Sequence, residues 1–200
     1  MTGTTLYPFL RRDPLDVTAS TAAKARESLE LRLRVLDELG QDLAACASAV
    51  AAALSGGGRI FAFGNGGSGT DAESVAGLFV ERGLPAISLA CDCALVTALG
   101  NDVGFEVVFA RQLAALGGPG DVALALSTSG GSANVLRGLA EAGRLGMVTI
   151  GFAGSGGGRL AAEGLAGHLF VVPSSSVHRI QEAQATLYHL LAELVAVRTP

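Results

Sequence analysis

The chain has 200 residues, of which half are apolar and 16% are charged; this excludes a disordered chain and suits one domain with a sizeable core. A net charge of −4 and a pI near 5.3 argue against a broad nucleic-acid-binding surface. No segment has the apolar length of a signal peptide or a membrane span, and the three cysteines lack zinc-type spacing, so we expect a protein of the reducing cytoplasm.

The N-terminal part is predicted to be helical after an irregular segment at residues 1–18. Ser20 and Thr21 are good N-caps, and apolar residues recur at helical spacing after them. Gly40 is interpreted as a break between two helices, and the glycines after Ser55 as the end of the second. Residues 19–55 are therefore predicted to form a helical hairpin.

From residue 59 onward, short and continuously apolar runs alternate with helical patterns. Such runs are typical of parallel strands that are buried on both faces. We predict strands at 59–64, 86–90, 122–127, 148–153 and 168–172, and helices at about 69–82, 104–117, 132–145, 157–164 and 178–197. The alternation predicts an α/β fold with a doubly wound, five-stranded parallel sheet, in which 59–200 form the core and C-terminal helix of a single domain over 1–200. The apolar surface of the terminal helices predicts a helical bundle shared between subunits.

Polar loops follow two of these strands, at the sheet edge where ligands bind in such folds. The second loop, "STSGGSAN", carries hydroxyl groups at Ser127, Thr128, Ser129 and Ser132. The next helix begins directly after Ser132, which is placed to cap it. An anion can be held here without Lys or Arg, by backbone N–H groups, by these hydroxyls and by the N-terminus of that helix. We expect this loop to hold the phosphate of a sugar phosphate; the alternative is an ordinary polar turn.

The first loop, "GNGGSGTDA", has glycines that permit close backbone approach, together with Asn65 and Ser68, whose side chains can bind sugar hydroxyls or phosphate. It is not a Walker loop, because no Gly-Lys-Ser/Thr follows. A dinucleotide site is disfavoured because the next strand does not end in an acidic residue. Both loops are predicted to face one crevice.

Four segments resemble the sugar isomerase (SIS) domain family, and within it the phosphoheptose isomerases, over nearly the whole chain. They are "FGNGGSxxDA", "GND" at 100–102, "STSGxSANV" at 127–135, and "RIQE" at 179–182 with His189. The resemblance implies a flavodoxin-like sheet, a homotetramer with a central helical bundle, and active sites between subunits. It implies isomerisation of sedoheptulose 7-phosphate to D-glycero-D-manno-heptose 7-phosphate, or of a related sugar phosphate, through an enediol. The implied substrate-binding residues are Asn65, Gly66, Gly67, Ser68, Asp102, Ser127, Thr128, Ser129 and Ser132.

The catalytic part of the family's site is altered in this sequence. In the family, four side chains serve proton transfer and zinc binding. They are a His and a Glu four residues apart, the Gln of RIQE, and a His on the last helix. The last two correspond to Gln181 and His189, which the resemblance makes catalytic residues and the remaining ligands of any metal. The first two positions hold Ser74 and Leu78, which neither accept a proton from carbon nor ligate zinc.

Two further side chains are candidates for the missing base. Glu81 follows Leu78 on the same helical face, about one turn displaced, although a solvated Glu near a helix end is the plainer interpretation; Glu73 faces another direction. His178 stands where relatives have an acidic residue, and an imidazole there can transfer protons. The structural alternatives are a loop histidine for His178, a core side chain for His189 and a capping residue for Gln181.

Two functions remain open. One is a sugar-phosphate isomerase with a changed base, favoured by Gln181 and His189. The other is a non-catalytic sugar-phosphate-binding or assembly protein that resembles the DnaA-associating initiator protein, favoured by Ser74 and Leu78. In neither case do we expect direct contact with nucleic acid or a membrane.

Overall fold

The structure is a computed structural model that describes residues 17–199. The predicted irregular segment 1–18 lies outside this range except for its last two residues, which begin the first helix. Along 17–199, none of the helices is both long and apolar enough to span a lipid bilayer.

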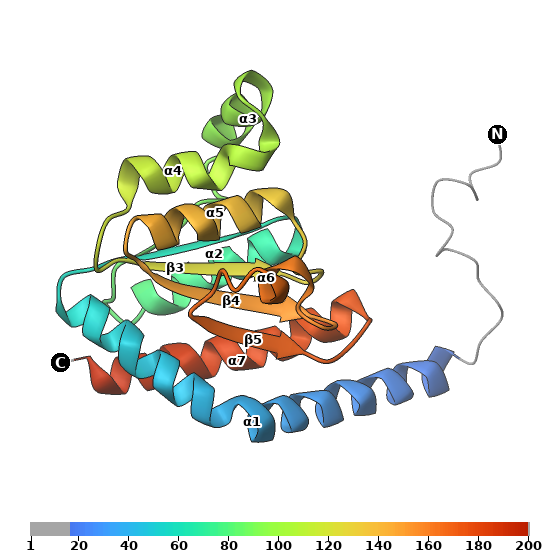
Figure 1. Cartoon of the computed structure of the whole chain (residues 1–200). Coiled ribbons are helices and arrows are strands. Elements are labelled where there is room, and N and C mark those ends of the chain that lie inside the picture. Colours follow the sequence, from blue (N-terminus) through green and yellow to red (C-terminus); the bar gives the residue numbers. More distant parts are fainter. Residues whose placement is uncertain (1–16, 200) are drawn as a thin grey trace, which may run out of the picture.

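Five parallel strands form one sheet in the order β2-β1-β3-β4-β5 (Figure 1). The strands are β1 (Ile60–Gly64), β2 (Ala86–Ser88), β3 (Val122–Ser127), β4 (Val148–Gly154) and β5 (His168–Val172). This order is flavodoxin-like and confirms the predicted doubly wound fold. The winding direction changes between β1 and β3, so the carboxyl ends of these two strands border the crevice where ligands bind in such sheets.

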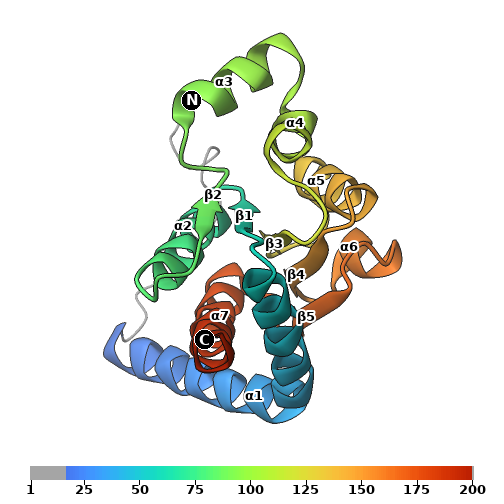
Figure 2. The same cartoon turned by 90° about the vertical axis from the view of Figure 1, so that its left-hand side faces the viewer.

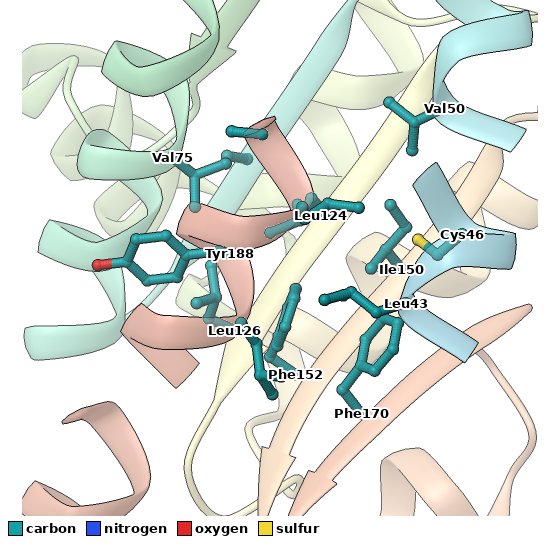
Figure 3. Packing of buried hydrophobic residues seen from close by; sticks show 14 of the residues in the cluster. Leu43, Cys46, Val50, Val75, Leu124, Leu126, Ile150, Phe152, Phe170 and Tyr188 are labelled. Atoms are coloured by element: carbon teal, nitrogen blue, oxygen red, sulfur yellow. The ribbon is translucent and has the colours of Figure 1, made fainter. Parts of the chain in front are cut away.

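Helices cover both faces of the sheet (Figure 2). One face carries α1 (Val17–Ser55), α2 (Gly67–Val80) and α7 (Val177–Arg198), and the other carries α4 (Val108–Leu116), α5 (Ala133–Arg144) and α6 (Gly158–Ala162). Successive residues of a strand point to opposite faces of the sheet. Leu124 and Leu126 therefore contribute to the core beneath α1 and α7 (Figure 3), and Ala123 and Ala125 contribute to the core beneath α4 and α5. Five predicted strands and five predicted helices are thereby confirmed, within a few residues at their ends.

The predicted helical hairpin is wrong. Residues 17–55 form one helix of 39 residues that changes direction along its length (Figure 2). Gly40 lies inside this helix and is not among the glycines with positive φ. Glycine in a helix interior costs only about 1 kcal/mol relative to alanine. Buried residues such as Val35 before it and Leu43 after it continue one apolar stripe against the core, and this packing outweighs the glycine.

Replacing Gly40 with alanine is therefore expected to stabilise the protein by about 1 kcal/mol. A Cβ atom at this position meets nothing within 4 Å, so the only change is a better helix former. Chemical denaturation measures the effect. The control is Gly57→Ala, which also enters open space but at a φ of +89°, and it should be destabilising. A loss of stability in Gly40→Ala would mean that the chain does break at this glycine in solution.

One helix was not predicted. α3 (Cys93–Asp102) lies between β2 and α4, and the carboxylate of Asp92 caps it by accepting the N–H of Leu95 at 2.9 Å. None of its residues is buried, and it projects beyond the sheet (Figure 1). The following segment contains a short 3₁₀ turn (Phe105–Val107) before α4. Cys91 and Cys93, which flank the cap, are exposed free thiols.

Candidate functional site

The serine-rich loop after β3 is closed by its own polar groups. Ser127 ends the strand and is buried, and its hydroxyl lies 3.3 Å from that of Ser132. The N–H of Gly130 donates to the carbonyl of Ser127 at 3.0 Å, and the N–H of Gly131 donates to Oγ of Ser129 at 3.2 Å. The loop is thus a compact turn that leads into α5.

A second segment, the turn between β4 and α6, holds this loop from behind. Gly154 donates its N–H to the carbonyl of Thr128 at 3.0 Å, and Leu160 donates to the carbonyl of Gly130 at 2.8 Å. Gly130 has a φ of +60°, and a Cβ atom on it would lie 2.0 Å from the carbonyl oxygen of Gly157. Only glycine fits there, so the shape of the serine-rich loop depends on this position.

Ser132 stands at the predicted cap position, immediately before α5. Ser132 is the N-cap residue, but its hydroxyl makes no capping hydrogen bond because it faces Ser127 instead. The N-terminus of α5 therefore keeps backbone N–H groups and a partial positive charge directed toward the loop. This arrangement suits an anion such as a phosphate.

The glycine-rich loop after β1 faces the same crevice, as predicted. Gly66 adopts a φ of 55° before α2, and the N–H of Ser68 donates to the carbonyl of Asn65 at 3.0 Å. The side-chain amides of Asn65 and Asn134, the latter in the first turn of α5, donate to each other in two hydrogen bonds of 2.8 Å. This reciprocal pair joins the two loops directly.

A hollow of about 220 Å³ adjoins the first loop. Its walls come from the start of α2, the end of β2 and the segment around α4, and they include Asn65, Thr70, Glu73, Ala90, Phe105 and Phe109. Asn65 therefore lies both beside this hollow and against α5. The place of Glu73 beside this hollow was not expected from the sequence, which made Glu73 a weaker candidate than Glu81 for the missing base.

Three side chains join α2 to α7 and were not predicted as a group. Nε2 of Gln181 donates to Oδ2 of Asp71 at 2.9 Å, and the hydroxyl of Tyr188 donates to Oδ1 at 3.3 Å. We call Asp71, Gln181 and Tyr188 the α2–α7 polar cluster. Figure 3 shows the ring of Tyr188 among the core residues beside α2. Burial, and after it the charge and hydrogen bond of Asp71, raise the pKa of Tyr188 to about 12, so its hydroxyl remains a donor at neutral pH.

The remaining predicted catalytic side chains lie on exposed positions. His189 is exposed, with its ring stacked on that of Tyr188 at 5.3 Å between centroids, and eight residues separate it from Gln181, or about 12 Å along a helix. His178 is exposed in the first turn of α7, and Glu81 is the exposed C-cap of α2, at the opposite end from Gly67. Asp102 is exposed at the end of α3, where it accepts a hydrogen bond from Asn101 at 2.7 Å. Within one chain these residues do not gather around Gln181.

The family resemblance implies a zinc ion, but the residues present do not fit one. The hydroxyl of Ser74 donates to the carbonyl of Thr70 at 3.1 Å, and Leu78 packs against the apolar core. The amide nitrogen of Gln181 faces a carboxylate. Among residues 17–199, no three His, Cys, Asp or Glu side chains come close enough together to hold a metal ion.

Comparisons with known proteins agree with the fold. The family model of the SIS domain matches residues 25–154. A phosphoheptose isomerase of Aquifex aeolicus is 47% identical over 176 residues, which cover 85% of this chain and 91% of that relative, and one of Thermodesulfovibrio yellowstonii is 40% identical over 182 residues, covering 86% and 90%. Among solved structures, the phosphoheptose isomerase of Neisseria gonorrhoeae superimposes with a TM-score of 0.86 at 35% identity, covering 90% of this chain and 98% of that one. The phosphoheptose isomerase of Francisella tularensis has the same TM-score at 32% identity, covering 92% of this chain and all of that one.

Proposed function

Because this chain belongs to the SIS domain family, among the phosphoheptose isomerases, we propose that it binds a sugar phosphate and interconverts its ketose and aldose forms. The substrate we propose is sedoheptulose 7-phosphate, with D-glycero-D-manno-heptose 7-phosphate as the product, or a related sugar phosphate. The observation that carries this proposal is the Asn65–Asn134 pair, since it brings both polar loops to one crevice at the β1/β3 switch point.

In this proposal the serine-rich loop holds the phosphate. Ser127, Thr128, Ser129 and Ser132 supply hydroxyl donors, and the N-terminus of α5 adds backbone N–H groups and a favourable dipole. The hollow lined by Asn65 and Gly66 would take the carbon chain, and the Asn65–Asn134 pair connects it to the helix that follows the serine-rich loop. We propose that Gly67 and Ser68, which follow in the same turn, also contact the sugar. The phosphate end is thereby fixed while the carbonyl end reaches α2.

A homo-oligomer with active sites between subunits is part of the same proposal. The N-terminal turns of α1 extend past the core (Figure 1), and Leu29 and Leu33, farther along this helix, are 58% and 55% exposed. A second copy would cover this apolar surface. It would also bring His178, His189 or Asp102 of one subunit toward the crevice of another. We place the protein in the cytoplasm, as its composition suggests.

A second function, binding without catalysis, is favoured by one observation: Ser74 and Leu78 stand where the family has its proton-accepting and metal-binding side chains. Moving a proton between C1 and C2 needs a base. On α2, Glu73 borders the hollow, whereas Glu81 lies at the far end of the helix. Either glutamate, or His178 or His189 from a neighbouring copy, is a candidate for this base.

The decisive experiment combines a melting curve with isomerisation in heavy water. Sedoheptulose 7-phosphate should raise the melting temperature, because it binds only the folded chain. An isomerase should in addition place deuterium at C2 of the product. Glu73→Gln and Glu81→Gln, compared side by side, show which glutamate this step requires: losing the label while keeping the melting shift identifies the base.

The two functions separate cleanly in this experiment. A melting shift without deuterium in the wild-type protein supports the binding protein. If neither sedoheptulose 7-phosphate nor a hexose phosphate shifts the melting temperature at millimolar concentration, the phosphate-binding role of the serine-rich loop is wrong.

A further inference from the structure

The side chain of Gln181 is held by this chain rather than left available to an ion. A carboxylate only accepts hydrogen bonds, so the group of Gln181 that faces Asp71 at 2.9 Å is the amide nitrogen. The carboxamide packs closely against Gly67, where a Cβ atom would come within 2.5 Å of Nε2 and 3.1 Å of Oε1. Its position is therefore fixed from both sides.

Both oxygens of the carboxylate that holds it already accept a hydrogen bond from α7. Oδ2 of Asp71 accepts from Gln181, and Oδ1 accepts from the hydroxyl of Tyr188 at 3.3 Å. The side chain of Ser74 lies beside the phenol of Tyr188, and the raised pKa of Tyr188 keeps this phenol protonated. Every member of the α2–α7 polar cluster thus has a partner within the cluster or beside it.

The two α2 positions that face the cluster offer an ion nothing stronger than a hydroxyl. The hydroxyl of Ser74 already donates to the backbone carbonyl of Thr70, and the side chain of Leu78 has no lone pair. Zinc sites in proteins use thiolates, imidazoles and carboxylates. Apart from the carboxylate of Asp71, which is hydrogen-bonded to both Gln181 and Tyr188, the donors here are a carboxamide oxygen and a neutral hydroxyl.

We infer that this site takes its sugar phosphate without a divalent metal ion, and that the hydrogen bonds of Asp71 position Gln181 in place of coordination to an ion. The inference rests on the proposed function in that it concerns the same site. Gln181 here offers its carbonyl oxygen to the sugar, and Asp71 is a positioning residue that acts through it.

The first test counts metal in the full-length wild-type protein after incubation with zinc and desalting. Elemental analysis should find far less than one zinc per chain, and EDTA should change neither the melting temperature nor its shift by sedoheptulose 7-phosphate. One zinc per chain that disappears in Gln181→Ala or His189→Ala would overturn the inference. These measurements also detect a metal site that forms only between subunits.

The second test restores the missing ligands. The double variant S74H/L78E places an imidazole and a carboxylate four residues apart on the face of α2 that lies against Gln181, and it should gain about one zinc per chain. The control E73H/G77E puts the same side chains at the same spacing on exposed positions of α2, where Gly77 has open space. It should gain no stoichiometric zinc.

Equal zinc contents in the two double variants would show that the cluster does not stand where a metal would bind, and would overturn the inference. The zinc counts do not depend on turnover or on sugar binding. If the sugar phosphate shifts no melting temperature in any variant, the proposed function fails while the metal question is still answered.

Discussion

Replacing Gly130 with alanine is expected to weaken sugar-phosphate binding by well over tenfold and to lower the free energy of unfolding by roughly 2–5 kcal/mol. Two causes add. The left-handed backbone at φ +60° costs a residue with a Cβ atom about 1–2 kcal/mol. The new methyl group would also lie 2.0 Å from the carbonyl oxygen of Gly157, so the serine-rich loop and the turn behind it must separate. Titration calorimetry with a sugar phosphate and urea denaturation measure the two effects.

The neighbouring glycine supplies a matched control. Gly131 is exposed, its φ is not in the left-handed region, and a Cβ atom on it would meet nothing nearer than Oγ of Ser129 at 3.7 Å. Gly131→Ala should therefore leave stability and binding close to the wild type. If Gly130→Ala is destabilised but binds the sugar phosphate with unchanged affinity, the phosphate is held elsewhere in the crevice.

Replacing Asp71 with alanine is expected to destabilise the protein by about 2–4 kcal/mol, because it removes the acceptor of two hydrogen bonds between α2 and α7. Tyr188 is the more sensitive partner, since its side chain is largely buried and its hydroxyl would lose its carboxylate. Urea denaturation measures the change. Glu73→Ala removes a carboxylate from an exposed position of the same helix and should change stability by no more than about 0.5 kcal/mol.

A spectroscopic measurement distinguishes loss of the Asp71–Tyr188 hydrogen bond from a general loss of packing in the protein. The chain has two tyrosines, so a Tyr7→Phe background leaves Tyr188 as the sole phenol. Asp71 contributes charge and a hydrogen bond to the raised pKa of Tyr188, although burial is the larger cause. In Asp71→Ala the phenol should therefore ionise at lower pH while the protein is still folded. Unchanged ionisation together with unchanged stability would show that Asp71 and Tyr188 do not interact in solution.

Much of the fold was predictable because its signals are local. The strands are continuous apolar runs, and continuous runs of that length are typical of a buried parallel sheet. Gly40 and α3 show where local signals fail. The long helix continues through Gly40 because distant core residues hold both halves in one stripe, and α3 begins at a cap, Asp92, that is a single residue between two cysteines.

The candidate site divides in the same way. The polar loops were predicted at the correct sheet edge, because strand ends and glycines mark them in the sequence. The α2–α7 polar cluster was not, because Asp71 lies 110 and 117 residues from its two partners. One signal was present: Gln181 and Tyr188 are seven residues apart and so share a helical face. The exposure of His178 and His189 was also beyond prediction, since it depends on how α7 packs.

The Asn65–Asn134 pair has a consequence for how tightly a ligand can be held. Each amide satisfies the other, so both loops are already ordered before anything enters the crevice. Little conformational entropy then remains to be lost on association, and the free energy of each new contact goes into affinity. A crevice that is rigid before binding also selects ligands by shape. It should bind weakly any sugar whose distance between phosphate and carbonyl differs from that of the substrate, because the loops do not rearrange to fit it.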